Sequence, residues 1–196
     1  EHSLEERSFS TAQKKEELSH LFTLANRIIQ IKKIGSYSAY ISSLINAIDL
    51  LIERTDISDN RIPLSGFLQS ICEYTIEQTP ISVAVTIEYD ITDIVISRIQ
   101  AFSAAVICID TISGALKHAF PERLTGRIWI SAEKHEDNIS LVICDDGIGV
   151  PEAVLPQENK LPGTTVLEEI CHNAECIVVR ELGKAGTIVT ARFTIQ

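Results

Sequence analysis

The chain has 196 residues, of which 45% are hydrophobic, and a net charge of −10. This length allows one ordinary core with a smaller element beside it, so we expect one or two domains. The acidic charge excludes nucleic acid as an expected partner, because phosphate binding depends on Lys and Arg that release counterions. No apolar run approaches the roughly 20 residues of a membrane span, and no signal-peptide pattern opens the sequence, so we expect a cytoplasmic protein with no membrane segment in this stretch.

The cysteines predict a reducing environment. Their number is odd, they are scattered, and most lie inside apolar strand or helix patterns, which is typical of core residues in cytosolic proteins. The spacing of Cys171 and Cys176, with His172 between them, matches no common metal site, so we expect no metal there. The five are Cys72, Cys108, Cys144, Cys171 and Cys176.

The N-terminal part predicts a helical hairpin. Apolar residues recur at helical spacing over residues 10–34, Gly35 and Ser36 interrupt the pattern, and a second helix follows. The second helix carries a stripe of Tyr37, Ile41, Leu44, Ile48 and Leu51 at intervals of four and three residues. A lone hairpin with such stripes leaves apolar surface exposed. We therefore expect residues 1–57 to form a dimeric four-helix bundle with a second copy.

Residues 62–196 predict a separate α+β domain, after a polar linker at 55–63. Helices interleaved with a mostly antiparallel sheet predict a two-layer sandwich. The expected elements are a helix at 64–77, a strand at 81–89, one or two helices over 97–120, strands at 126–134 and 138–145, a helix at 165–174, and strands at 176–182 and 187–195.

The first candidate binding motif is a carboxylate at a strand end. Asp145 is followed by Gly147 and Gly149. A carboxylate in this place can accept a hydrogen bond from an adenine amino group, and the glycines allow the backbone to approach the base. By itself, the motif is equally consistent with an acidic turn, because Asp-Asp-Gly is a common turn sequence.

A second motif favours the binding interpretation. Residues 114–121 read Gly-Ala-Leu-Lys-His-Ala-Phe-Pro. With the motif at Asp145, they resemble the N box and G1 box of bacterial sensor histidine kinases, which carry the GHKL or Bergerat-type ATP-binding module, in the subclass whose N box reads Asn-Ala-Leu-Lys-His-Ala-Phe-Pro. The order of expected elements over 62–196 also resembles that module. The resemblance implies ATP and magnesium as cofactors and a response-regulator receiver domain as partner.

The resemblance also implies roles for single residues. Asp145 would read the adenine, with Gly147 and Gly149 beside it. Lys117 and His118 match the basic pair that faces the nucleotide phosphates. Asp110 stands at the acidic position, usually Glu, that acts as a base or orients the attacking group.

Two departures put the kinase activity in question. Gly114 replaces the Asn that holds magnesium, and glycine has no side chain to bind a metal. The second glycine-rich box keeps Gly163 alone, and Pro162 removes a backbone donor. Phosphoryl transfer depends on positioned charge, so we expect ATP binding to be weak or absent and insensitive to magnesium.

The phosphoacceptor position has two possible registers. Residues 17–20 resemble the opening of the subclass H box, which makes His20 the acceptor. A gap-free register from the second helix, where residues 45–48 resemble the Ile-Arg-Ala-Ile of the family, places Phe9 there instead. We favour the second register, in which the chain has lost both its acceptor histidine and its magnesium ligand.

These observations favour a degenerate two-component signalling protein. It would act on a response regulator by phosphotransfer, or by binding without ATP chemistry. The alternative is an active sensor histidine kinase that phosphorylates His20 and passes the phosphate to a regulator. A serine-kinase anti-sigma factor on the same fold is disfavoured, because those proteins lack the N-terminal hairpin.

Overall fold

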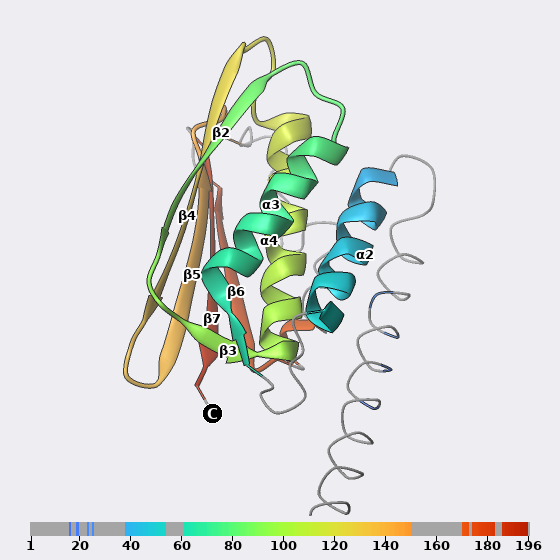
Figure 1. Ribbon diagram of the computed structural model, residues 1–196. Coiled ribbons are helices and arrows are strands. Elements are labelled where there is room, and N and C mark those ends of the chain that lie inside the picture. Colours follow the sequence, from blue (N-terminus) through green and yellow to red (C-terminus); the bar gives the residue numbers. More distant parts are fainter. Residues whose placement is uncertain are drawn as a thin grey trace, which may run out of the picture.

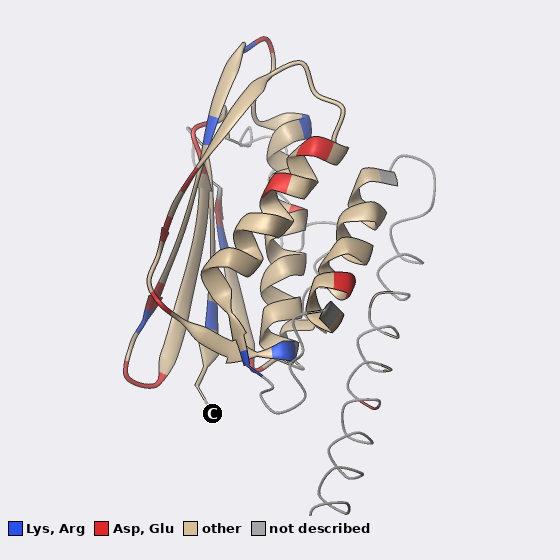
Figure 2. Ribbon diagram, viewed as in Figure 1, with Lys and Arg blue, Asp and Glu red and all other residues tan. Residues whose placement is uncertain are grey.

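The computed structural model describes residues 16, 19, 23, 25, 38–53, 61–149, 170–172, 174–182 and 186–195. In this part of the chain, one face of a five-stranded sheet is covered by two helices, and a third helix lies outside them (Figure 1). In Figure 2 only short stretches of the three helix ribbons carry the colours of charged residues, in keeping with a largely buried helical layer. The expected α+β class is confirmed.

The sheet has the order β2-β4-β5-β7-β6. The β2–β4 pair is parallel, and the β4–β5, β5–β7 and β6–β7 pairs are antiparallel, so the prediction of a mostly antiparallel sheet holds. The strands are β2 (Ala84–Ile91), β4 (Thr125–Lys134), β5 (Asn138–Asp145), β6 (Cys176–Leu182) and β7 (Thr187–Thr194). Strict alternation of buried positions along β4 and β5 explains why their boundaries could be predicted to within a residue.

The central helix α4 (Arg98–His118) packs on the sheet and is buried along most of its length. Ser97 begins it with a capping box, in which its hydroxyl accepts from the Gln100 N–H and the Gln100 side chain accepts from the Ser97 N–H. The helix is long and apolar enough to cross a membrane by length and composition, but 78% of its most apolar window is buried in the fold. It is therefore the core helix of this domain.

Helix α3 (Leu64–Gln78) packs beside α4. One short strand precedes each of these two helices, and the two strands pair with each other in antiparallel fashion. This pair consists of β1 (Arg61–Pro63) and β3 (Val95–Ser97). The prediction of a linker at residues 55–63 was wrong for the last three residues, which form β1. Ile62, only 1% exposed, is the sole buried residue of β1, so there was no periodicity to detect.

Helix α2 (Ser38–Glu53) packs against α3 and α4, on the side away from the sheet (Figure 1). Leu44, Ile48 and Leu51 of the predicted stripe are buried. These three residues of the stripe are thus covered within one chain, while Ile45 and Ile52 on the same helix remain 51% and 39% exposed. The described residues at positions 16, 19, 23 and 25 are helical. The rest of the hairpin, with its turn at 35–36, lies outside the described residues, as do Phe9 and His20.

Candidate functional site

A cavity of about 170 Å³ opens between α4 and the sheet. Asp110, Gly114 and His118 contribute to its wall from one face of α4, because they follow one another at intervals of four residues. From the sheet side come Asp145 and Gly149, at and after the end of β5, and the strands β6 and β7. The remaining lining residues are Thr111, Ala115, Ala119, Arg180, Thr187 and Val189.

Asp145 is buried at this cavity and held in place by hydrogen bonds. Its carboxylate accepts from the Gly147 N–H at 2.8 Å and from the backbone N–H and hydroxyl of Thr187. Burial raises the pKa of Asp145, and the hydrogen bonds from Gly147 and Thr187 offset part of that increase. Thr187 is not among the site residues predicted from the sequence.

The raised pKa predicts how Asp145 affects stability with pH. The folded state binds the proton more tightly than the unfolded chain, whose Asp pKa is about 3.9. The contribution of Asp145 to stability is therefore lost as pH rises through its folded pKa and regained as pH falls. We expect the stability of the parent relative to Asp145→Asn to increase as the pH is lowered from neutral, measured by urea unfolding. A difference that does not vary with pH would contradict this.

The turn after β5 is fixed against the end of α4. The Ile148 N–H donates to the Ala119 carbonyl at 2.9 Å, and a Cβ added to Gly147 would lie 2.4 Å from the Ala119 Cβ. Glycine at 147 is therefore required by the close approach of the helix. Gly149 has a φ of 69°, which also favours glycine.

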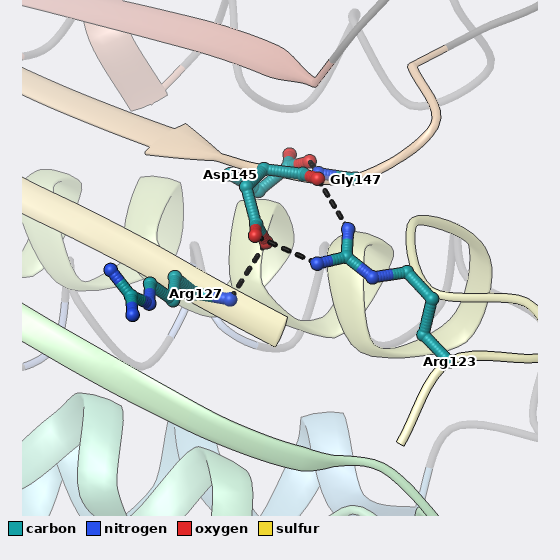
Figure 3. Close-up of polar contacts among 5 residues, drawn as sticks. Arg123, Arg127, Asp145 and Gly147 are labelled. Atoms are coloured by element: carbon teal, nitrogen blue, oxygen red, sulfur yellow. Dashed lines mark hydrogen bonds and ion pairs between the residues drawn. The ribbon is translucent and has the colours of Figure 1, made fainter. Parts of the chain in front are cut away.

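Two arginines hold the same turn, Arg123 through its side chain and Arg127 through its backbone N–H (Figure 3). Arg123 forms an ion pair with the Asp146 carboxylate at 2.8 Å and also donates to the Asp146 carbonyl, while the Arg127 backbone N–H donates to that carboxylate at 2.8 Å. Burial acts to raise the pKa of Asp146, but the contacts with Arg127 and Arg123 outweigh it, so the pKa is lowered. These contacts position the strand end that carries Asp145.

Arg180 of β6 crosses the cavity to Asp110 of α4. The two side chains form an ion pair at 2.6 Å. Tyr40 of α2 lies near this pair. Burial and, to a lesser extent, the charge of Asp110 raise the pKa of Tyr40, while the charge of Arg180 lowers it. The only sequence signal for Arg180 is its place in β6, where it shares the inward phase of Cys176 and Val178.

Gly114 faces open space. A Cβ added at this position would meet nothing within 4 Å. The structure thus brings Asp110, Gly114, His118, Asp145 and Gly149 together at one cavity, and places Gly147 in the turn that supports Asp145. Lys117 is exposed and is not among the residues that line it. Gly163 lies outside the described residues.

The cavity fits an adenine-like ring and does not fit magnesium. Asp145 offers acceptor oxygens beside apolar walls, and Thr111 Oγ1 is a buried atom with no hydrogen-bond partner in the described part of the chain. For a magnesium ion, Gly114 has no side chain that could bind it, and the carboxylate of Asp110 is already ion-paired with Arg180. The described ranges contain no group of three or more His, Cys, Asp or Glu that could hold a metal ion.

Sequence comparison finds no match for this chain, either to a protein-family profile or to a curated protein. Structural comparison finds many. The histidine kinase domain of the Erythrobacter litoralis EL346 blue-light activated histidine kinase superposes with a TM-score of 0.71 and 22% identity, over 96% of this chain and 94% of that one. A longer form of that kinase gives a TM-score of 0.70 and 20% identity, and the match covers 91% of this chain and 58% of that one.

A second kinase supports the same fold over part of the chain. The catalytic domain of the histidine kinase ThkA gives a TM-score of 0.51 and 15% identity over 68% of this chain and 93% of that one. These identities are low, so the similarity concerns the fold. The chain therefore has the fold of a sensor histidine kinase core.

Proposed function

We propose that this chain is a degenerate histidine kinase-like protein of two-component signalling. It acts on a response regulator by phosphotransfer or by binding, without ATP chemistry of its own. The observation that carries the proposal is Gly114, which stands at the cavity wall with open space where a magnesium-binding side chain is expected from the resemblance.

The rest of the cavity supports this proposal. The base-reading half is intact, since Asp145, Gly147 and Thr187 form a connected set of hydrogen bonds. The catalytic half is altered, because the carboxylate of Asp110 pairs with Arg180 at 2.6 Å. A carboxylate engaged by a guanidinium is a poor proton acceptor, because the neighbouring positive charge favours its ionised form.

The partners and location follow from the same proposal. The partner is a response-regulator receiver domain, which would dock on the N-terminal helices, and the setting is the cytoplasm. A GHKL-type module over residues 62–196 and a homodimer remain parts of the proposal. Because the α2 stripe is covered by α3 and α4, a dimer seam would have to lie on another surface.

Titration of nucleotide into the purified chain, with and without magnesium, tests the proposal. We expect the parent to bind ATP weakly and with the same affinity in both conditions. Gly114→Asn should gain magnesium-dependent ATP binding, because the position has room for the side chain and supplies the missing ligand. We expect a gain of about tenfold or more, which corresponds to one charge-assisted contact.

Gly114→Ala is the matched control. It fills the same open space without adding a metal ligand, so its ATP affinity should remain that of the parent. Micromolar, magnesium-dependent binding by the parent would overturn the proposal. It would favour the alternative of an active kinase, and detection of phosphate on His20 that disappears in His20→Ala would establish that alternative.

A further inference from the structure

We propose that two copies of this chain associate through their β6 strands and so form one continuous sheet. The inference names a surface for the homodimer that the proposed function includes, and the nucleotide part of that function does not depend on it. Three features of β6 carry the inference: it is an open edge of the sheet, its outward side chains include exposed apolar residues, and the charges around it match those of a second copy.

Strand β6 ends the sheet on one side. It pairs with β7, and no strand lies beyond it in the described part of the chain. An antiparallel strand points about half of its backbone N–H and C=O groups toward each side, so the outer half of these groups on β6 faces away from the sheet. An extended strand of another molecule can pair with them.

The outward side chains at this edge are largely apolar. Arg180 reaches Asp110 of α4, so Ile177 and Val179, which alternate with it, point away from the helices. Ile177 is 69% exposed and Val179 is 50% exposed. Ile188 of β7 is exposed on the same face. Pairing with a second strand would remove part of this apolar surface from water.

The opposite edge of the sheet, β2, lacks this character. Its outward residues Thr86, Glu88 and Asp90 are all exposed, and two of them are acidic. A second β2 strand beside it would bring like charges together, which is a common way to prevent association at an edge. The two edges thus differ, and the side chains favour β6 as the one that associates.

An antiparallel pair of β6 strands with Val179 on the twofold axis matches the side chains of the two copies. Val179 then lies opposite Val179 of the second copy, and Ile177 lies opposite Glu181. Within one chain, Arg192 of β7 is the cross-strand neighbour of Ile177. Glu181 of one copy and Arg192 of the other therefore share a row, about 10 Å apart at the backbone, and their side chains can meet in two symmetric ion pairs.

Registers that differ by two residues lack this match. A shift in one direction sets Glu181 opposite Glu175 of the second copy, and like charges in opposite positions are destabilising. A shift in the other direction sets Ile177 opposite Gly183, beyond the end of β6. The register with Val179 on the axis is therefore the favoured one.

The inner face of the pair is compatible with this register. Val178, which is half-buried, lies opposite Arg180 of the second copy. The aliphatic part of Arg180 can cover Val178 while its guanidinium keeps the ion pair with Asp110. Both charged residues of β6, Arg180 and Glu181, thus keep or gain an ion pair in the dimer.

Light scattering on the full chain and on two variants tests the inference. We expect the parent to show twice the 21.7 kDa mass of one chain at tens of micromolar. Val179→Lys sets two like charges opposite each other on the twofold axis, so we expect a monomer. Thr86→Lys is the matched control, because it adds the same side chain at an exposed outward position of the other edge strand. It should keep the mass of the parent.

Exchange of the charges at 181 and 192 tests the register. Glu181→Arg and Arg192→Glu each set like charges in one row of the dimer, and each should raise the dissociation constant of the dimer at least about tenfold, measured by sedimentation. The double variant restores opposite charges and should return to within about threefold of the parent. The two residues lie in different rows within one chain, so this rescue reports a contact between copies.

The outcomes separate this inference from the proposed function. Circular dichroism checks the fold of each variant, and the charge exchange decides if Val179→Lys is unfolded. If folded Val179→Lys keeps the mass of the parent, or if the double variant associates no more tightly than the single ones, the inference is wrong and a dimer through another surface stays in the proposal. If the parent is a monomer, the inference and the homodimer are both wrong, and nucleotide titration still decides the rest of the proposed function.

Discussion

Leu44→Asp is expected to destabilise the packing of α2 by at least about 4 kcal/mol. Leu44 is fully buried, and α2 packs against α3 and α4. Loss of a buried Leu side chain alone costs about 2–5 kcal/mol, and an unpaired, desolvated carboxylate adds to this. Urea unfolding followed by circular dichroism measures the effect, and hydrogen exchange locates it in α2.

Ile45→Asp is the matched control. Ile45 follows Leu44 on the same helix but is 51% exposed, so the same change should alter stability by no more than about 0.5 kcal/mol. Light scattering on Leu44→Asp also examines the predicted bundle. If Leu44 lies in a seam between two copies, the variant will fall from dimer to monomer while keeping its fold, and the packing of α2 described here will be refuted.

Gly186→Ala is expected to cost on the order of 2–5 kcal/mol of folding free energy. An added Cβ would lie 2.0 Å from the backbone carbonyl oxygen of Asp145, and the φ of Gly186 is +82°. Neither backbone can move easily, because Asp145 ends β5 and Gly186 directly precedes β7. Thermal unfolding measures the effect.

Gly114→Ala provides the comparison within the same cavity. Gly114 lies inside α4 with no atom within 4 Å of an added Cβ, so the change should be neutral or stabilise the helix by up to about 1 kcal/mol. Equal destabilisation by the two substitutions would mean that the steric argument for Gly186 is wrong.

The sequence predicted most of the C-terminal fold, for a physical reason. Strands β4 and β5 alternate buried and exposed side chains, and α4 (Arg98–His118) lies within the long apolar stretch at 97–120. Short elements were missed. Strands β1 and β3 have three residues each, which is too few to show a period.

The candidate site divides in the same way. Asp145 and Gly147 could be found from sequence because a strand end followed by glycines places a carboxylate and a close-approaching backbone by local geometry alone. Arg180 could not, because its role depends on Asp110, seventy residues earlier, which reaches it only when β6 and α4 pack together. Thr187 likewise acquires a role through the neighbouring strand end of Asp145.

By itself, the sequence determined the periodic elements, the two glycine-bearing motifs and the loss of a metal ligand at Gly114, because each is a property of residues close together in the chain. Only the tertiary structure decided that the α2 stripe is covered by α3 and α4, and that Arg180 neutralises Asp110 at the cavity. An apolar stripe predicts that a surface will be buried but not which surface covers it. A charged residue on the inward face of a strand, such as Arg180, likewise predicts that it has a partner but not which residue it is. The covering surface and the charge partner both depend on contacts between segments distant in sequence.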